Sequence, residues 1–213
     1  MTDIQFNPYT SKDATALYTL CESAWSFRDY TTNEATRKSL VKVDAYGALM
    51  GTDYQELAWV GNQPAGVLIG QSKTVLSGIK NLKYRALFWG VLFKLYFIHK
   101  DAKDALKNFR KVDKAYQKLY KSLKKQYNAE VILFIVHPSM QGKGVGKTLM
   151  NRYVKHCKKR GYKRFYLFTD TSCNYGFYDH YGFNYIGTES VNLHLKTQDE
   201  ILTTFVYELE LTS

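Results

Sequence analysis

The sequence QGKGVGKT, Gln141 to Thr148, joins an apolar run to a segment of helical character. Val131 to Val136 before it are expected to form a strand, and Leu149 to Arg160 after it are expected to form a helix. A strand that passes through glycines into a helix presents unpaired backbone N–H groups at the positive end of the helix dipole. Such a junction binds anions, phosphate groups above all. The chain is therefore expected to be an α/β protein with a phosphate site here.

Two phosphate-binding patterns overlap in this stretch. The nucleotide-binding pattern GxxxxGK[ST] finds its last three letters at residues 146–148, but its required first glycine falls on Gln141. A start at Gly142 leaves the loop one residue short, so that it could not close around a β-phosphate in the usual way. The pattern QxxGxG fits instead, with Gln141, Gly144 and Gly146 at its fixed positions. A glycine-rich turn without a ligand is the third interpretation, which the flanking sequence decides.

The flanking sequence extends the second pattern over residues 129–187. The segment VHPSMQGKGVGKTLM resembles the end of the fourth strand, the pyrophosphate-binding loop and the third helix of the GNAT superfamily, the acetyl-CoA-dependent N-acetyltransferases. KRFYLFTD, Lys163 to Asp170, is typical of the next strand, and NYGFYDHYGF, Asn174 to Phe183, resembles the family's NxxxY followed by GF. The resemblance implies a mixed, splayed central sheet flanked by helices. It also implies acetyl-CoA as co-substrate and no metal.

The same resemblance implies which residues hold acetyl-CoA. Backbone N–H groups from Gln141 to Lys147 would bind the pyrophosphate, and backbone groups at the end of the fourth strand would pair with the pantetheine amides. Asn174 matches the position that contacts the pantetheine region. The expected cofactor-binding residues are Ile135, Val136, His137, Gln141, Gly142, Lys143, Gly144, Val145, Gly146, Lys147, Asn174 and Tyr178.

Two residues are candidates for catalysis. A protonated amine cannot attack a thioester, so transfer at neutral pH needs a base or a desolvating site. Glu130 lies eleven residues before Gln141, the offset at which the histone-lysine branch of the superfamily carries its base; a solvent-exposed carboxylate at the strand edge, or a water chain, is the alternative. Tyr178 matches the family's tyrosine and would protonate the departing thiolate, unless it serves packing alone.

The N-terminal part follows the order that the resemblance implies. DIQFN alternates like a first strand, and a helix is expected after it with Ser11 as its N-cap. A second helix is expected from about residue 33 to residue 50. Two apolar runs around residues 61–64 then predict a hairpin.

The segment of residues 73–127 is longer than the connection that the family needs between its third and fourth strands. We therefore expect a helical insertion there. Leu106, Phe109, Val112 and the apolar residues after them recur at helical spacing, whereas the first half, around ALFWGVLFKLYFIHK, suits a buried helix or an interaction surface. The insertion contains 15 Lys and Arg against 3 Asp and Glu, a net charge of +12 in a chain of net charge +11. This basicity indicates either a surface for an acidic partner or a solvated face on a helical cover, and we favour the cover. Lys118, Lys121 and Lys125 are expected to face water.

Composition sets the remaining expectations. With 213 residues, 45% of them hydrophobic, the chain is expected to form a single domain over residues 1–213. Its three cysteines show no paired spacing, it lacks a signal-peptide pattern, and its longest apolar run is far too short to span a bilayer, so we expect a cytoplasmic protein. None of the five histidines has metal-site or triad spacing.

The predicted function is transfer of acetyl from acetyl-CoA to a primary amine on a small molecule, peptide or protein. No specific nucleic-acid partner is expected, and a homodimer stays open. The alternative is a catalytically silent module of the same fold that binds nucleic acid or an anionic membrane through its basic insertion.

Overall fold

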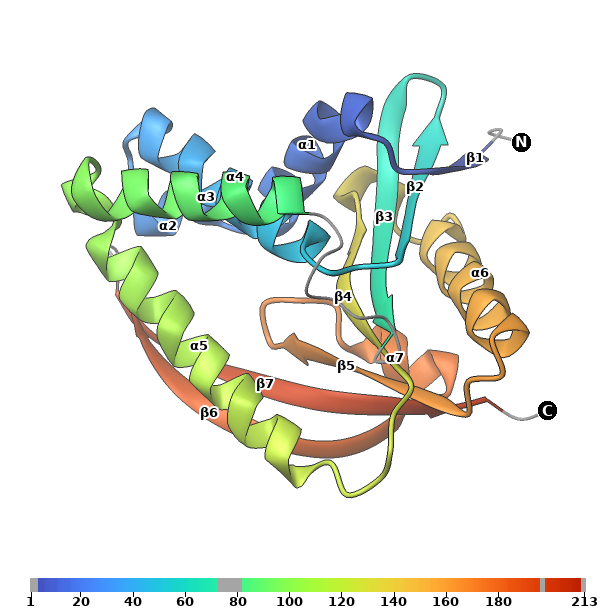
Figure 1. Cartoon of the computed structure of the whole chain (residues 1–213). Coiled ribbons are helices and arrows are strands. Elements are labelled where there is room, and N and C mark those ends of the chain that lie inside the picture. The colour runs from blue at the N-terminus through green and yellow to red at the C-terminus, as the bar shows by residue number, and fades with distance from the viewer. Residues whose placement is uncertain (1–3, 73–81, 196–197, 212–213) are drawn as a thin grey trace.

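A computed structural model describes residues 4–72, 82–195 and 198–211 (Figure 1). Over these residues the strands form one sheet in the order β1-β2-β3-β4-β5-β7-β6. The strands are β1 (Ile4–Pro8), β2 (Tyr54–Val60), β3 (Gln63–Ser72), β4 (Ala129–Val136), β5 (Arg164–Asp170), β6 (Asn184–His194) and β7 (Asp199–Glu210). The helices are α1 (Ala14–Ala24), α2 (Phe27–Tyr30), α3 (Glu34–Leu49), α4 (Leu82–Phe97), α5 (Lys103–Ser122), α6 (Val145–Lys159) and α7 (Gly176–Tyr181). Short 3₁₀ turns lie at Ser11–Asp13, Lys100–Ala102 and Pro138–Met140.

The sheet is mixed, and it opens between β4 and β5. These two strands are parallel neighbours from Ala129 beside Phe165 to Val131 beside Leu167. Beyond that point β4 stays paired with β3 as far as Val136, and β5 continues beside β7. Among the described residues, no strand pairs with the β5-facing edge of β4 after Val131. The predicted splayed sheet is confirmed.

A β-bulge changes which side chains of β4 face which layer. Opposite β3, Ile69 pairs with Leu133 and the next residue, Gly70, pairs with Val131, so Ile132 is an extra residue. Before the bulge Val131 packs in the core beneath α6, whereas Leu133 and Ile135 pack beneath α1 and α3. Because of this phase change, the odd-numbered residues of β4 supply both cores.

Each face of the sheet has its own apolar core. Beneath α6 and α7 lie Leu149, Tyr153, Phe165 and Tyr178 with their neighbours, and beneath α1 and α3 lie Leu17, Leu40 and their neighbours. Figure 1 shows α6 on one side of the opened sheet and α1 and α3 on the other. Both layers of helices are amphipathic and bury their apolar faces on strands, which is how an α/β domain closes its core.

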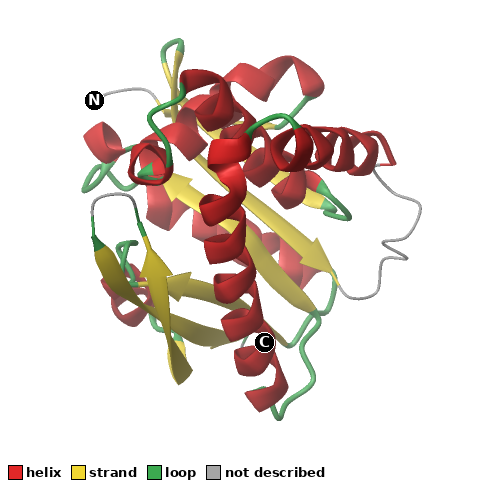
Figure 2. Ribbon diagram, turned by 90° about the vertical axis from the view of Figure 1, so that its left-hand side faces the viewer, coloured by secondary structure: helices red, strands yellow, loops and turns green. Residues whose placement is uncertain are grey.

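Two helices, α4 and α5, lie between β3 and β4, in the segment that the sequence analysis interpreted as an insertion; residues 73–81 of that segment lie outside the described residues. The apolar stripe of α5 rests on β6 and β7, with Ala115 beside Val191 and Leu193, and Leu119 beside Val206. Figure 2 shows α5 running vertically across the front of the sheet. The predicted amphipathic helix is confirmed. Its apolar residues, which recur at helical spacing, are buried against β6 and β7.

The first helix begins differently from the prediction. Thr10, rather than Ser11, caps a 3₁₀ turn that leads into α1, because the Asp13 carboxylate accepts hydrogen bonds from both the N–H and the hydroxyl of Thr10, each at 2.8 Å. The second helix begins as predicted, since the Asn33 side chain accepts the Thr36 N–H at 3.1 Å. Its range and the hairpin around residues 61–62 agree with the sequence analysis.

Within the described chain, none of the helices combines the length and apolar character that crossing a bilayer requires.

Candidate active site

The glycine-rich stretch forms the N-terminus of α6. The helix begins at Val145, four residues earlier than the sequence predicted, with Gly144 as its N-cap. The first intrahelical bond runs from the Thr148 N–H to the Gly144 carbonyl at 3.0 Å. In the described residues no backbone carbonyl accepts the N–H groups of residues 142 and 144–147. They lie at the positive end of the helix dipole, where the sequence analysis predicts an anion site.

Two of the predicted pyrophosphate donors need correction. The N–H of Gln141 donates to the Pro138 carbonyl at 3.3 Å, and the N–H of Lys143 donates to the Met140 carbonyl at 3.4 Å. Both groups therefore close the turn that leads to the loop. The N–H groups left for a ligand are those of Gly142, Gly144 and the first three residues of α6.

Glycine is needed at the two positions of the QxxGxG pattern for different structural reasons. Gly144 adopts φ +81°, a left-handed conformation that a side chain disfavours, while the space around its Cβ position is open. At Gly146 a Cβ would lie 3.1 Å from Val136 Cγ2 and 3.3 Å from Phe134 Cζ. Gly146 thus lets the start of α6 approach the end of β4, and Gly144 sets the entry angle of the helix.

The residues of β4 whose backbone groups face the opening differ by one position from those that the sequence analysis predicted. The His137 N–H donates to the Ala65 carbonyl at 2.9 Å, and its carbonyl accepts the Met140 N–H at 2.8 Å. The Ile135 carbonyl also faces β3, because a Cβ on Gly66 would lie 2.8 Å from it. Since backbone groups alternate in direction along an antiparallel strand, those of Phe134 and Val136 face the opening. We therefore replace Ile135 and His137 by Phe134 in the candidate set and keep Val136.

Tyr178 lies in α7 on the same side of the sheet as α6. It is buried, and its ring packs against Phe134, Phe183 and Tyr207. Burial raises the pKa of its hydroxyl, nearby Cys173 raises that pKa further, and a hydrogen bond with Thr169 lowers it. The hydroxyl therefore keeps its proton at neutral pH, as a group that donates a proton must.

A polar turn at the end of β5 surrounds the Tyr178 hydroxyl. Buried Asp170 accepts the Ser172 N–H at 2.9 Å and the Tyr116 hydroxyl at 3.3 Å. Burial, with the charge of Asp170 second, raises the pKa of Cys173 to about 11. Asn174 is exposed and precedes α7, so it lies outside the helix that carries Tyr178. Asp170 and Tyr116 carry no family motif, and their meeting depends on how α5 packs.

Glu130 lies at the paired end of β4, away from Tyr178. Its carboxylate accepts the Tyr166 hydroxyl at 2.7 Å, and its carbonyl accepts the Tyr153 hydroxyl at 3.0 Å. Its register partner in β5 is Tyr166, before the strands separate, and its side chain lies on the face opposite α6. The two predicted catalytic residues therefore lie on opposite faces of the sheet, and no described contact joins them.

Lys125 is exposed, as expected, and it also forms ion pairs that the sequence analysis did not predict. Its Nζ donates to Glu208 at 2.7 Å and to Glu210 at 2.9 Å, and Tyr127 donates to the other oxygen of Glu208. Glu208 is buried, so its charge needs these partners. Hydrogen bonds with Glu208 and then Glu210 raise the pKa of Lys125, and the bond from Lys125 lowers the pKa of Glu210.

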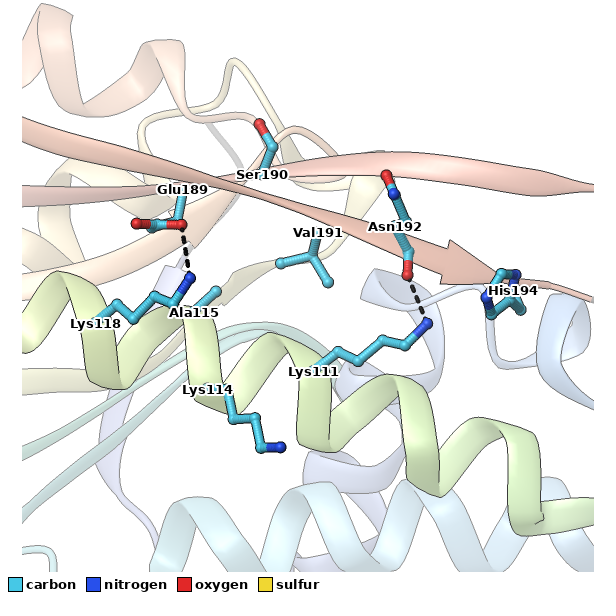
Figure 3. A pocket seen from close by; sticks show the side chains of 9 residues that line it. All are labelled: Lys111, Lys114, Ala115, Lys118, Glu189, Ser190, Val191, Asn192 and His194. Carbon is cyan, nitrogen blue, oxygen red and sulfur yellow. Dashed lines mark hydrogen bonds and ion pairs between the residues drawn. The ribbon is translucent and has the colours of Figure 1, made fainter.

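An open groove of about 480 Å³ lies between α5 and β6 (Figure 3). Lys118 reaches Glu189 across it at 3.5 Å, and Lys111 donates to the Asn192 carbonyl at 2.8 Å. The lysine-rich side of α5 is thus partly used in holding the helix on β6. No residue of the glycine-rich loop lines this groove, which separates it from the candidate active site.

Among the residues that the structure describes, no group of three or more His, Cys, Asp or Glu side chains is arranged to hold a metal ion. Cys21, Cys157 and Cys173 are free thiols, as their spacing predicted.

Comparison with protein families identifies the model of the acetyltransferase (GNAT) family over residues 107–183. That range contains most of α5, β4, the glycine-rich loop, α6, β5 and α7. A search of curated protein sequences finds no match.

Solved structures share the whole fold at low sequence identity. The protein smu.2055 of Streptococcus mutans UA159 is 14% identical, with a TM-score of 0.57 over 98% of this chain and 99% of that one. An N-acetyltransferase of Staphylococcus aureus Mu50 is 14% identical, with a TM-score of 0.54 over 99% of each chain. A GNAT family acetyltransferase of Brucella melitensis in complex with acetyl-CoA is 13% identical, with a TM-score of 0.50 over 100% of this chain and 91% of that one.

These findings confirm the resemblance and the fold class that the sequence analysis gave. The family match indicates that residues 107–183 are an acetyltransferase-type segment, and the solved structures show that the whole described chain shares their fold.

Proposed function

From the GNAT family match and the GNAT-type fold, we propose that this acetyl-CoA-dependent N-acetyltransferase transfers acetyl directly to a primary amine, with Tyr178 as general acid. Residues 73–127 are a helical insertion in one such domain. The acceptor is a small amine, a peptide or a protein.

The observation that supports this proposal most is that three features lie close together: the unpaired edge of β4, the start of α6 and Tyr178. The unpaired edge of β4 ends at Val136, which touches the start of α6 at Gly146. Phe134, on the same edge, has its ring 5.3 Å from Phe177 and 6.4 Å from Tyr178, measured between ring centres. A ligand with a pyrophosphate at one end and amides along its arm would bind the N–H groups of α6 and then follow β4. Its thioester would then lie near the polar turn around Tyr178.

The chemistry follows from this placement. The neutral amine attacks the thioester carbonyl, so a C–N bond forms and the carbonyl oxygen takes up negative charge. Collapse of that intermediate breaks the C–S bond, and the Tyr178 hydroxyl gives its proton to the departing sulfur. The amine must also lose a proton. Because Glu130 lies on the opposite face of the sheet, we assign this proton to Glu130 through water in the opening between β4 and β5.

No observation favours the catalytically silent alternative. Tyr178 is buried with its hydroxyl protonated, and the N–H groups at the start of α6 have no backbone partner among the described residues.

The loop is tested by matched substitutions at the two ends of α6. Gly144 and Gly161 have φ values of +81° and +69°, and neither has an atom within 4 Å of its Cβ position. Asparagine tolerates this conformation better than most residues. Gly144→Asn places a side chain where the pyrophosphate would lie, so acetyl-CoA binding by calorimetry should weaken by at least about tenfold, the effect of one lost charged hydrogen bond. Gly161→Asn is the control, with the parent's affinity expected.

Equal affinities in the two variants would remove the pyrophosphate site from this loop, because the backbone strain is the same in both. Thermal unfolding of both variants checks that each remains folded.

The acid is tested by Tyr178→Phe, which deletes the hydroxyl and keeps the buried ring. Turnover, followed as thiol release from acetyl-CoA with a panel of primary amines, should fall by roughly ten- to ten-thousand-fold, the range for a lost acid catalyst. The affinity for acetyl-CoA should barely change. Tyr181→Phe, a tyrosine of the same helix that bonds Asn151, is the control. Unchanged turnover in Tyr178→Phe would leave that residue a packing role only.

A further inference from the structure

Helix α4 has two apolar faces, and the protein covers one of them. Tyr84, Phe88 and Val91, together with Leu92 and Leu95, pack in the core with α3. The opposite face carries Leu82, Trp89, Phe93 and Phe97, which are 68%, 61%, 61% and 62% exposed. Their spacing of seven, four and four residues places them on one side of the helix. Figure 1 shows α4 lying across α3 at the edge of the molecule.

The outer face is too apolar to be an ordinary solvent-facing surface. Tyr96 and Ile98 extend it at 51% and 64% exposure. The rings contact one another, with Phe93 and Phe97 at 4.4 Å between centroids and Tyr96 and Phe97 at 4.9 Å. A contiguous group of large apolar side chains on a surface marks an interaction site. We call the side chains of residues 82, 89, 93 and 96–98 the aromatic face.

The charges beside the aromatic face indicate its partner. Lys83, Arg85 and Lys94 are exposed, and α4 contains no acidic residue. A second copy packed face to face would bring these three cations against three more, which is unfavourable. The partner should therefore carry negative charge beside apolar material.

We propose that the aromatic face docks α4 onto a membrane surface rich in anionic phospholipid. At 16 residues the helix is shorter than the roughly 20 needed to span a bilayer, so it would lie in the interface with Trp89, Phe93 and Phe97 among the acyl chains. Tryptophan and tyrosine favour this depth, and the long cationic side chains reach the phosphates. The enzyme would then act on acceptors at that surface.

A lipid surface fits the face better than nucleic acid does. Phosphate backbones are bound by rows of cations, and single-stranded bases stack on flat rings. Leu82 and Ile98, at 68% and 64% exposure, offer neither and would stay in water on a nucleic acid. In a bilayer interface every one of these side chains finds an apolar environment, and the three cations find phosphate.

Vesicle binding tests the proposal on the full chain. Sedimentation with phosphatidylcholine vesicles, with and without phosphatidylglycerol, should show binding that requires the anionic lipid. The emission of Trp89, isolated by difference from Trp89→Phe, should shift to shorter wavelength. Trp89→Ser with Phe93→Ser should weaken binding by at least about tenfold, because binding scales with the apolar area inserted. Lys83→Gln with Lys94→Gln should weaken it by about fivefold per charge.

Lys114→Gln with Lys121→Gln is the matched charge control on α5, and it should retain most of the binding. Calorimetry with acetyl-CoA should give the parent's affinity in all variants, which verifies folding. The proposal is overturned by vesicle binding that the double serine variant retains, or by no binding to either vesicle. A dimer in solution that the double serine variant loses would assign the face to a second copy, and a Trp89 shift with polyglutamate but not with vesicles would assign it to an acidic protein.

Discussion

Helices α4 and α5 follow one another between β3 and β4, and both are basic, but they use their apolar residues differently. In α5 the apolar residues form one stripe, which β6 and β7 cover, and the lysines lie outside it. In α4 the apolar residues surround the helix, so packing against α3 leaves a second apolar face exposed. The fold accounts for the single stripe of α5, whereas the second apolar face of α4 is the surface that we propose docks onto a membrane.

The charges of the two helices differ in the same way. Lys118 and Lys111 of α5 bond to Glu189 and to the Asn192 carbonyl of β6, and Lys125 beyond its end holds Glu208. The cations of α4 flank an apolar surface instead. Positive charge thus serves attachment to the sheet in α5 and lies at the edge of an apolar surface in α4.

The largest difference should appear in stability. Leu119 of α5 is 3% exposed and packs against Val206 and Tyr127, so Leu119→Ala should lower the free energy of unfolding by about 2–5 kcal/mol. Trp89→Ala on α4 removes a larger side chain but should change it by about 0.5 kcal/mol at most, because the ring is exposed. Urea denaturation of both variants measures the two values. Similar losses would mean that the aromatic face supports the fold.

The smallest effect concerns nucleic acid. If α5 is a cover, the chain should bind duplex DNA no more tightly than about 10⁻⁴ to 10⁻⁶ M at physiological salt, the range of non-specific contacts. Lys114→Gln with Lys121→Gln should then leave acetylation of small amines intact. Fluorescence anisotropy across a salt series measures the affinity. Submicromolar, salt-sensitive binding that this variant loses would make α5 a recruiting surface rather than a cover.

Much of the fold followed from the sequence because it depended on local patterns. The period of α5, the start of α3 near residue 33, the hairpin and the strand before the loop each lie within one segment. The start of α6 was placed four residues late, because Val145, Gly146 and Lys147 were interpreted as loop although they form the first turn of the helix. Whether the first half of the insertion was buried or exposed could not be predicted, since α4 is both.

The candidate site was predicted less completely, because it depends on how segments meet. Tyr178 and the glycine-rich loop carry motifs, and the structure places both around the end of β4. Alternation alone does not reveal which phase of β4 faces the opening, so Phe134 was missed and Ile135 was chosen. Asp170 and Tyr116 meet through tertiary packing, and so does the pair of Lys125 and Glu208. No spacing of residues in the sequence predicts such contacts.

The bulge at Ile132 makes the even-numbered side chains at the two ends of β4 point to opposite faces of the sheet. Without the bulge, the same residues would alternate strictly along β4, and Glu130 would share a side with Phe134 and Val136. With it, the carboxylate faces one layer of helices while the side chains next to the glycine-rich loop face the other. A change between the bulged and the regular register, at the same number of residues, would therefore move Glu130 from one face of the sheet to the other. Related chains should therefore be compared by side-chain direction along β4 before a glutamate at this position is assigned a role.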